Sequence, residues 1–225
     1  KNFHDGFTYF AERYQIMLYK KYIKRLLDIL LSVILLPFVI IVISLFGLLI
    51  KLEDRGPIFY CGERLGKDGR VFKMYKLRSM KVNAPDLRNP DGSTYNSDKD
   101  PRLTRIGRIL RKTSLDELPQ IFNVLKGDMS FIGPRPDLPE HINYYEGEEV
   151  RKLEVLPGIT GYNQAYFRNS VEWKQRLKND IYYVNNISFM LDFKILWKTV
   201  FSVLMEKGIY STNYKIRENN QFRES

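Results

Sequence analysis

The chain has 225 residues, 44% of them hydrophobic, and its 36 Lys and Arg residues outnumber 26 Asp and Glu residues, giving a formal net charge of +10. This length fits one domain with a proper core, and the positive charge predicts an anionic partner: a nucleic acid, a phosphate-bearing substrate or a negatively charged membrane. A merely soluble basic surface is the plain alternative. The single cysteine, Cys61, excludes an intrachain disulfide, and two histidines without a second cysteine exclude a zinc cluster.

The first strong pattern is the uncharged apolar run from Ile29 to Ile50, which is long enough to cross a bilayer. A buried core helix is the alternative. Cations flank the run on both sides, so the positive-inside preference places both ends in the cytoplasm. Pro37 lies inside the run, where proline removes a backbone hydrogen bond and bends a helix. We therefore expect residues 20–54 to form a re-entrant membrane helix kinked at Pro37, with a straight span as the alternative.

After this run the pattern becomes that of a small mixed domain. Short β-prone segments at 58–60 and 71–72 flank the turn Lys67-Asp68-Gly69, which predicts a β-hairpin. Residues 83–101 are rich in Pro, Asp, Asn, Ser and Gly and predict a long loop. Arginines then recur every third residue, which is typical of a basic amphipathic helix on an anionic membrane surface or of a solvated charged face. These are Arg102, Arg105, Arg108 and Arg111.

The next segment predicts a helix over 116–126, ending at Gly127. Pro119 fits only near its N-terminus, so Asp116 should lie at or near the cap. Ser114 and Glu117 have the spacing of a capping box. Further helices are expected over 172–186 and 188–206, the latter packed or lying in the membrane interface, and the tail from residue 212 should be flexible.

Adjacent carboxylates at a helix start also suit chemistry on phosphate. A carboxylate among cations stays ionised at neutral pH, and it can coordinate Mg²⁺ or attack phosphorus to form an acyl phosphate. Arginine binds phosphate oxygens with paired N–H donors. The residues alone leave capping and catalysis both open for Asp116 and Glu117. The nearby cations that could bind phosphate are Arg111, Arg135, Lys76 and Arg78.

Five segments, in order, resemble the bacterial sugar transferase family, the monotopic phosphoglycosyl transferases. They are KYIKRLLDILLS, GPIFY…ERLGKDGRVFKMYKLRSM, DPRLTRIGRILRKTSLDELPQIFNVLKGDMSFIGPRP, LPGITGYNQ and DIYYVNNISFMLD. The resemblance spans about residues 20–210. Two residues and one segment depart from the family pattern: Leu36 before the proline, Leu156 before Pro-Gly, and the segment GYNQAYFRN, so sugar specificity is not transferred.

The resemblance implies a transferase that moves a sugar 1-phosphate from a UDP-sugar to a polyprenyl phosphate, with Asp116 as nucleophile, Mg²⁺ as cofactor and Glu117 helping to hold Mg²⁺ or assisting the acceptor. It also implies a re-entrant helix bent at Pro37 and a location on the cytoplasmic face of the bacterial inner membrane. A membrane-tethered nucleic-acid-binding protein and a non-enzymatic scaffold are the alternatives, but no groove-reading motif or aromatic RNA platform is present, so we expect no nucleic-acid partner.

The expected fold is mainly α with a small β-hairpin, an α+β class in which interfacial amphipathic helices pack on a cytoplasmic catalytic domain. Its expected divisions are a juxtamembrane segment (1–19), the re-entrant helix (20–54), the catalytic domain (55–211) and a flexible tail (212–225).

Overall fold

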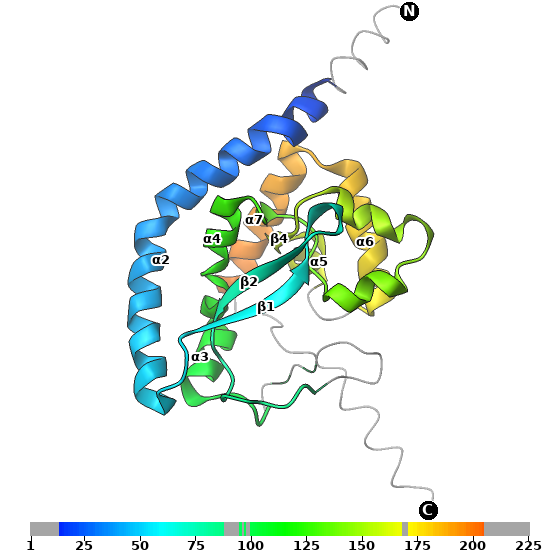
Figure 1. Cartoon of the computed structure of the whole chain (residues 1–225). Helices are drawn as coiled ribbons and strands as arrows, with labels where there is room; N and C mark the ends of the chain where they lie inside the picture. Colours follow the sequence, from blue (N-terminus) through cyan, green and yellow to red (C-terminus); the bar gives the residue numbers. More distant parts are fainter. Residues whose placement is uncertain (1–13, 88–94, 96, 98–99, 168–170, 205–225) are drawn as a thin grey trace, which may run out of the picture.

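The computed structural model describes residues 14–87, 95, 97, 100–167 and 171–204. The predicted tail from residue 212 lies outside these residues, as do most of the predicted juxtamembrane segment and much of the predicted loop over 83–101. The described chain is mostly helical, with two small sheets, as the sequence predicts in outline (Figure 1).

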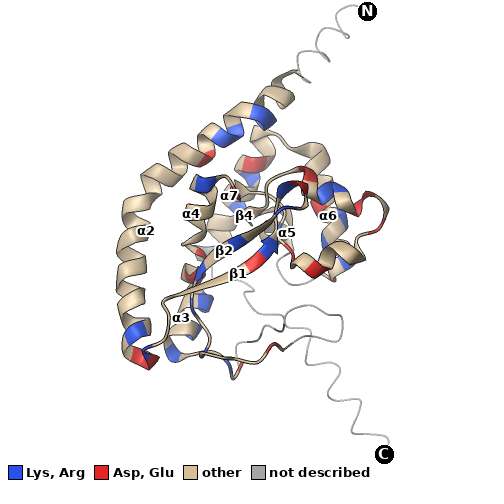
Figure 2. Ribbon diagram, in the orientation of Figure 1, with Lys and Arg blue, Asp and Glu red and all other residues tan. Residues whose placement is uncertain are grey.

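A long N-terminal helix curves around one side of the molecule (Figure 1). A π-helical turn, Tyr19–Ile23, leads into α2, Lys24–Asp54, which continues through Pro37. By length and composition the helix Tyr14–Asp54 could cross a membrane. Figure 2 shows that its charges lie at its two ends, and that the stretch between them is uncharged.

Both ends of α2 are fastened to the rest of the chain. At the start, Lys24 forms an ion pair with Asp192 (2.5 Å), and Arg25 donates to the backbone oxygens of Val124 and Leu125 at the end of helix α4, Gln120–Lys126. Asp28 accepts hydrogen bonds from the Ser130 hydroxyl (3.1 Å) and the backbone N–H of Phe131 (3.0 Å).

At the other end of α2, Glu53 accepts hydrogen bonds from the backbone N–H groups of Arg105 (2.6 Å) and Ile106 (3.1 Å), the first residues of helix α3, Arg105–Thr113. Asp54 pairs with the Arg78 guanidinium. The two ends of one apolar helix are therefore held by the same folded unit.

The predicted hairpin is present as β1, Phe59–Leu65, and β2, Val71–Leu77, joined by a 3₁₀ turn at Lys67–Gly69. Helix α3, Arg105–Thr113, packs close to the chain that follows β2. Gly107 makes this approach possible, because a Cβ there would lie 1.8 Å from the Ser79 carbonyl oxygen. α3 thus crosses directly beside the end of the hairpin.

The sequence predicted four arginines on one helix, and this prediction is wrong for the first of them, Arg102. Arg102 precedes α3 and is buried, paired with Asp100 at 2.7 Å, because the buried Asp100 carboxylate attracts its guanidinium. Arg105 and Arg108 are exposed on α3, whereas Arg111 is half-buried and donates to the Ser79 hydroxyl (3.1 Å). Two of the four arginines therefore face solvent on this helix.

The helix predicted over 116–126 is divided. A 3₁₀ turn, Leu115–Glu117, comes first, and α4, Gln120–Lys126, begins only after Pro119, its N-cap. The predicted capping box is absent, because Ser114 adopts a left-handed conformation (φ 58°) that ends α3 and its side chain makes no capping hydrogen bond. Asp116 consequently lies in the turn between two helices.

A second sheet was not predicted. β3, Ser130–Ile132, pairs in parallel with β4, Gly158–Thr160. Two 3₁₀ segments, Pro139–Tyr144 and Gly147–Glu154, connect these strands. Strands of three residues are too short to show an alternating pattern, and parallel pairing depends on residues distant in sequence.

The last described helices are α5, Tyr162–Tyr166, α6, Trp173–Asn186, and α7, Phe189–Leu204, and the last two confirm the predicted helices. α7 buries Asp192 and Ile195 against the core. Its opposite side exposes six large apolar side chains: Phe189, Met190, Phe193, Trp197, Val200 and Phe201. The core consists of small clusters; the π-helical turn before α2 contributes Tyr19 to one, and α2 contributes Ile50 to another.

Candidate active site

The turn that carries the two carboxylates is fixed by its neighbours. Leu110 of α3 is fully buried with Leu77 of β2 and Ile50 of α2, and Leu115 packs against this cluster. The next residue, Asp116, is only 7% exposed. Apolar anchoring on one side of the turn therefore places a carboxyl group in a largely water-excluded position.

Two of the predicted cations meet at Glu117. The Lys76 amine, from the end of β2, lies 2.7 Å from Glu117 Oε1. Arg135, from the loop after β3, places its Nη2 3.4 Å from the same oxygen. Segments distant in sequence therefore converge on the carboxylate pair.

Asp116 differs from its neighbour because no described residue donates a hydrogen bond to its carboxylate or pairs with it. Burial and the charge of Glu117 raise the pKa of Asp116 while Lys76, Arg111 and Arg135 lower it, and the net result is a pKa of about 6. At neutral pH the carboxylate is thus mostly ionised and unpaired. Such a group is free to bind a metal ion or to attack an electrophile.

The Glu117 carboxylate is held in its charged form. Burial alone would raise the pKa of Glu117, but Lys76 and Arg135 outweigh this effect and lower it to about 2. The paired glutamate and the unpaired aspartate are thus electrostatically distinct, although they are adjacent in sequence. Environments that push two neighbouring pKa values apart are typical of catalytic sites.

Of the four predicted phosphate-binding residues, three face this pair and one is used elsewhere. Lys76, Arg111 and Arg135 all act electrostatically on Asp116. The Arg78 guanidinium pairs with Asp54 and donates to the backbone oxygens of Pro57 (2.6 Å) and Met80 (3.0 Å). These contacts give Arg78 a role in fastening the end of α2.

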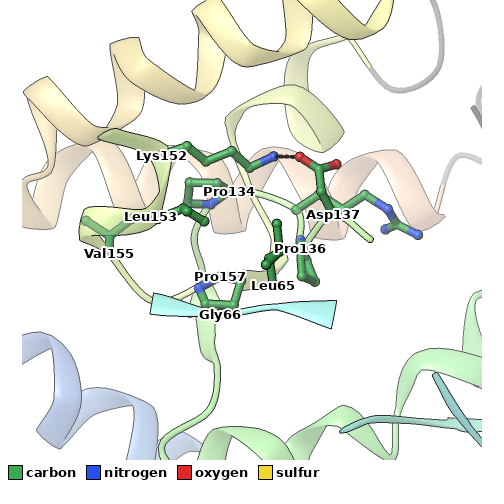
Figure 3. Close-up of a pocket in the computed structure, with 10 residues that line it drawn as sticks. Leu65, Gly66, Pro134, Pro136, Asp137, Lys152, Leu153, Val155 and Pro157 are labelled. Atoms are coloured by element: carbon green, nitrogen blue, oxygen red, sulfur yellow. Dashed lines mark hydrogen bonds and ion pairs between the residues drawn. The ribbon is translucent and has the colours of Figure 1, made fainter. Parts of the chain in front are cut away.

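The sequence analysis missed a buried network behind Arg135. Asp137 accepts from the Lys152 amine (2.7 Å) and from the Tyr145 hydroxyl (2.8 Å), and Lys152 also lies 2.9 Å from Asp180. Lys152 is 6% exposed, and the Asp137–Lys152 pair borders a small pocket that Arg135 also lines (Figure 3). The charges in this network are distant in sequence, so spacing gave no signal for it.

The described residues offer limited protein ligands for a metal ion. No group of three or more His, Cys, Asp or Glu side chains is gathered in the described part of the chain. Two groups beside the cations remain available to a metal ion. One is the Asp116 carboxylate, and the other is the second Glu117 oxygen, which no described donor contacts. This set fits Mg²⁺, which takes one or two carboxylates and completes its shell with water and substrate phosphates.

The chain is similar to known proteins over most of its length. The bacterial sugar transferase family model matches residues 19–206. An uncharacterized sugar transferase of Bacillus subtilis, EpsL, is 40% identical over 87% of this chain and 94% of its own. A putative undecaprenyl-phosphate N-acetylgalactosaminyl 1-phosphate transferase of the same organism is 47% identical over 68% of this chain and 80% of its own.

A third relative is the UDP-N-acetylgalactosamine-undecaprenyl-phosphate N-acetylgalactosaminephosphotransferase of Aeromonas hydrophila. It is 39% identical over 83% of this chain, which spans only 45% of that protein. The family match covers the long helix, the hairpin and the carboxylate pair together. The chain belongs to the bacterial sugar transferase family.

Proposed function

We propose that the protein transfers a sugar 1-phosphate from a UDP-sugar to a polyprenyl phosphate, such as undecaprenyl phosphate, and releases UMP. The observation that carries this proposal is the buried, unpaired Asp116 carboxylate beside three cations. Two relatives named for undecaprenyl-phosphate sugar phosphotransfer support the substrate classes.

The chemistry follows from the separate states of the two carboxylates. An Asp116 oxygen attacks the phosphorus next to the sugar, the bond from that phosphorus to the bridging oxygen breaks, and UMP leaves with the bonding electrons. An oxygen of the polyprenyl phosphate then attacks the same phosphorus and restores the Asp116 carboxylate. Arg111, Arg135 and Lys76 stabilise charge on the phosphates during both steps.

Glu117 and Asp116 would hold Mg²⁺, which supplies charge neutralisation of the substrate phosphates when bound. Lys76 and Arg135 keep Glu117 ionised and oriented at one oxygen. The protein's own contribution is to hold one carboxylate by ion pairs and leave the other open to the substrate.

A re-entrant arrangement of α2 suits this reaction, since both substrates' phosphates lie at one membrane face. Lys24 and Arg25 at one end, and Glu53 and Asp54 at the other, bind the same folded unit. A helix that crossed the bilayer would have to break one of these sets of contacts. We place this unit on the cytoplasmic face of the inner membrane, as the cations on both flanks of the run favour.

The test uses purified full-length protein in detergent with Mg²⁺ and a panel of UDP-sugars. Without acceptor, the protein should release about one UMP per molecule and gain the mass of a phosphosugar on the peptide that contains Asp116. Asp116→Asn should do neither, whereas Asp128→Asn, a matched change outside the site, should behave as wild type. Release of UMP only when both substrates are present would contradict the covalent route, and an active Asp116→Asn would overturn the nucleophile.

A further inference from the structure

Arg64 on β1 lies on the face of the hairpin that carries Lys76. In the antiparallel register Tyr60 is opposite Lys76, and side chains two and four residues along a strand share one face. Arg64 is four residues after Tyr60, so it shares a face with Lys76, which contacts Glu117. The hairpin thus extends from the carboxylate pair toward Arg64.

The far end of β1 is attached to the loop that carries Arg135. The backbone N–H of Leu65 donates to the Asp137 carbonyl oxygen at 2.9 Å, so Arg64 and Arg135 lie on two chain segments that are joined directly. Burial lowers the pKa of Arg64, and the charge on Arg135 lowers it further. The fold therefore holds two guanidinium groups close enough to repel each other.

No carboxylate contacts Arg64 directly among the described residues, although the charges of Asp137 and Glu140 act on it from a longer distance and oppose the effect of Arg135. The hydrogen bond of Arg64 goes to the backbone oxygen of the adjacent residue, Glu63 (2.6 Å), and no Asp or Glu among the described residues forms an ion pair with it. The two buried arginines elsewhere, Arg78 and Arg102, are each paired with an aspartate. A half-buried guanidinium without a carboxylate lacks the partner that burial of a charge normally requires.

The backbone below Arg64 leaves room for its side chain. A Cβ at Gly62 would lie 3.2 Å from Arg64 Nη1 and 3.1 Å from the Tyr60 hydroxyl oxygen. Both groups therefore extend over this glycine, and the Tyr60 side chain is 54% exposed. A hydroxyl donor and a guanidinium thus flank one position on an accessible surface.

We propose that Arg64, together with Arg135, binds a second phosphate of the nucleotide-sugar, the one that departs with UMP. The inference rests on the proposed function. Arg135 contacts Glu117, the neighbour of Asp116, and its loop is hydrogen-bonded to the strand that carries Arg64, so Arg135 is close to both the reacting carboxylate and the second cation. A UDP-sugar presents two adjacent phosphates, which fits one phosphate at Asp116 and the next between Arg135 and Arg64.

The experiment measures the two half-reactions separately in full-length protein with Mg²⁺. UMP binding is measured by calorimetry, the donor half-reaction by UMP release, and the acceptor half-reaction by the decay of isolated phosphosugar enzyme with polyprenyl phosphate. Arg64→Met should weaken UMP binding and raise the donor KM by about tenfold to a hundredfold, the range of a charge-assisted hydrogen bond. Its effect on the acceptor half-reaction should be less than about threefold.

Two further variants keep the inference falsifiable. Arg64→Lys retains the charge without the paired N–H geometry and should lose part of the UMP affinity. Arg70→Met removes an exposed arginine near the hairpin turn and should match wild type. If Arg64→Met loses too much stability to assay, Arg64→Lys and Tyr60→Phe carry the measurement.

The outcomes separate the inference from the function it rests on. If Arg64→Met binds UMP as tightly as wild type, the inference is overturned. If Arg64→Met is too unstable to assay, wild-type UMP affinity in both Arg64→Lys and Tyr60→Phe overturns it. The proposed function is upheld in either case as long as the wild-type protein releases UMP. A slowed acceptor half-reaction with normal UMP binding assigns Arg64 to the acceptor phosphate and also overturns it. Absence of UMP release by wild type with every UDP-sugar would overturn the proposed function itself.

Discussion

Replacing the proposed nucleophile should stabilise the protein. Asp116 is buried without a partner, and its pKa is raised from an ordinary value of 3.8 to about 6. This difference corresponds to about 3 kcal/mol of folding free energy lost at neutral pH relative to a neutral side chain. Asp116→Asn removes the charge and keeps the shape, so it should abolish turnover and raise the free energy of unfolding by about 1–3 kcal/mol.

The sign of the pH dependence provides the sharper measurement. Because the folded protein holds the Asp116 proton more tightly than the unfolded chain, wild-type stability falls as pH rises from about 4 to about 6. The advantage of Asp116→Asn in thermal unfolding should therefore be full above about pH 6 and absent near pH 4.

Asp137→Asn is the control of opposite sign. Burial alone would raise the pKa of Asp137, but the charge and hydrogen bond of Lys152, together with hydrogen bonds from His141 and Tyr145, outweigh this and lower it below its ordinary value. This variant should therefore be less stable than wild type at neutral pH, and the deficit should shrink in acid. An Asp116→Asn protein that melts below wild type at pH 7.5, or an advantage that does not change with pH, would refute the reasoning.

Other consequences of the same geometry can be measured directly. The kcat/KM for UMP release should fall below about pH 6 as Asp116 becomes protonated, and a flat profile down to pH 5 would contradict that assignment. Lys76→Met removes a cation that lowers the pKa of Asp116, so the acid limb of this profile should move to higher pH. Lys152→Met leaves the buried carboxylates of Asp137 and Asp180 without their shared cation and should cost about 3–5 kcal/mol of stability, measured by thermal or denaturant unfolding. Lys152→Arg keeps the charge and should cost less. A Lys152→Met protein as stable as wild type would contradict the role of this network. Pro37→Leu removes the proline and favours a straight helix by about 3 kcal/mol, so cysteine labelling at positions 2 and 215 in a Cys61→Ser background should show a mixed topology. If positions 2 and 215 of the otherwise unchanged Cys61→Ser protein are labelled from opposite sides of the membrane, the re-entrant arrangement is overturned.

Local signals in the sequence predicted much of the architecture. The apolar run, the Lys67–Gly69 turn and the last two helices each have a pattern within a few residues, and the structure confirms them. The capping box failed because the left-handed conformation at Ser114 ends one helix before the next begins. Local spacing could not show that Glu117 has stronger partners elsewhere in the fold.

The electrostatic partners in the site depend on contacts across the chain. Lys76 reaches Glu117 from a strand 41 positions away, so the sequence could nominate both residues but could not pair them. Arg78 lies two residues after Lys76 but pairs with Asp54 instead, because β2 ends at Leu77 and the alternation of faces along the strand stops before Arg78. Arg64 and Lys152 gave no signal, since their importance comes from burial and from neighbours supplied by other elements.

The fastening of α2 at both ends has a consequence for how the protein is made. Tyr19 and Ile50 fill two of the core clusters, and Asp28, Glu53 and Asp54 satisfy polar groups on β3, α3 and the chain after β2. A chain whose apolar helix had not yet docked would expose these surfaces and groups to water. We therefore expect the docking of α2 and the folding of the rest of the described chain to be coupled, so that a chain cut after Asp54 should be much less stable than the whole protein.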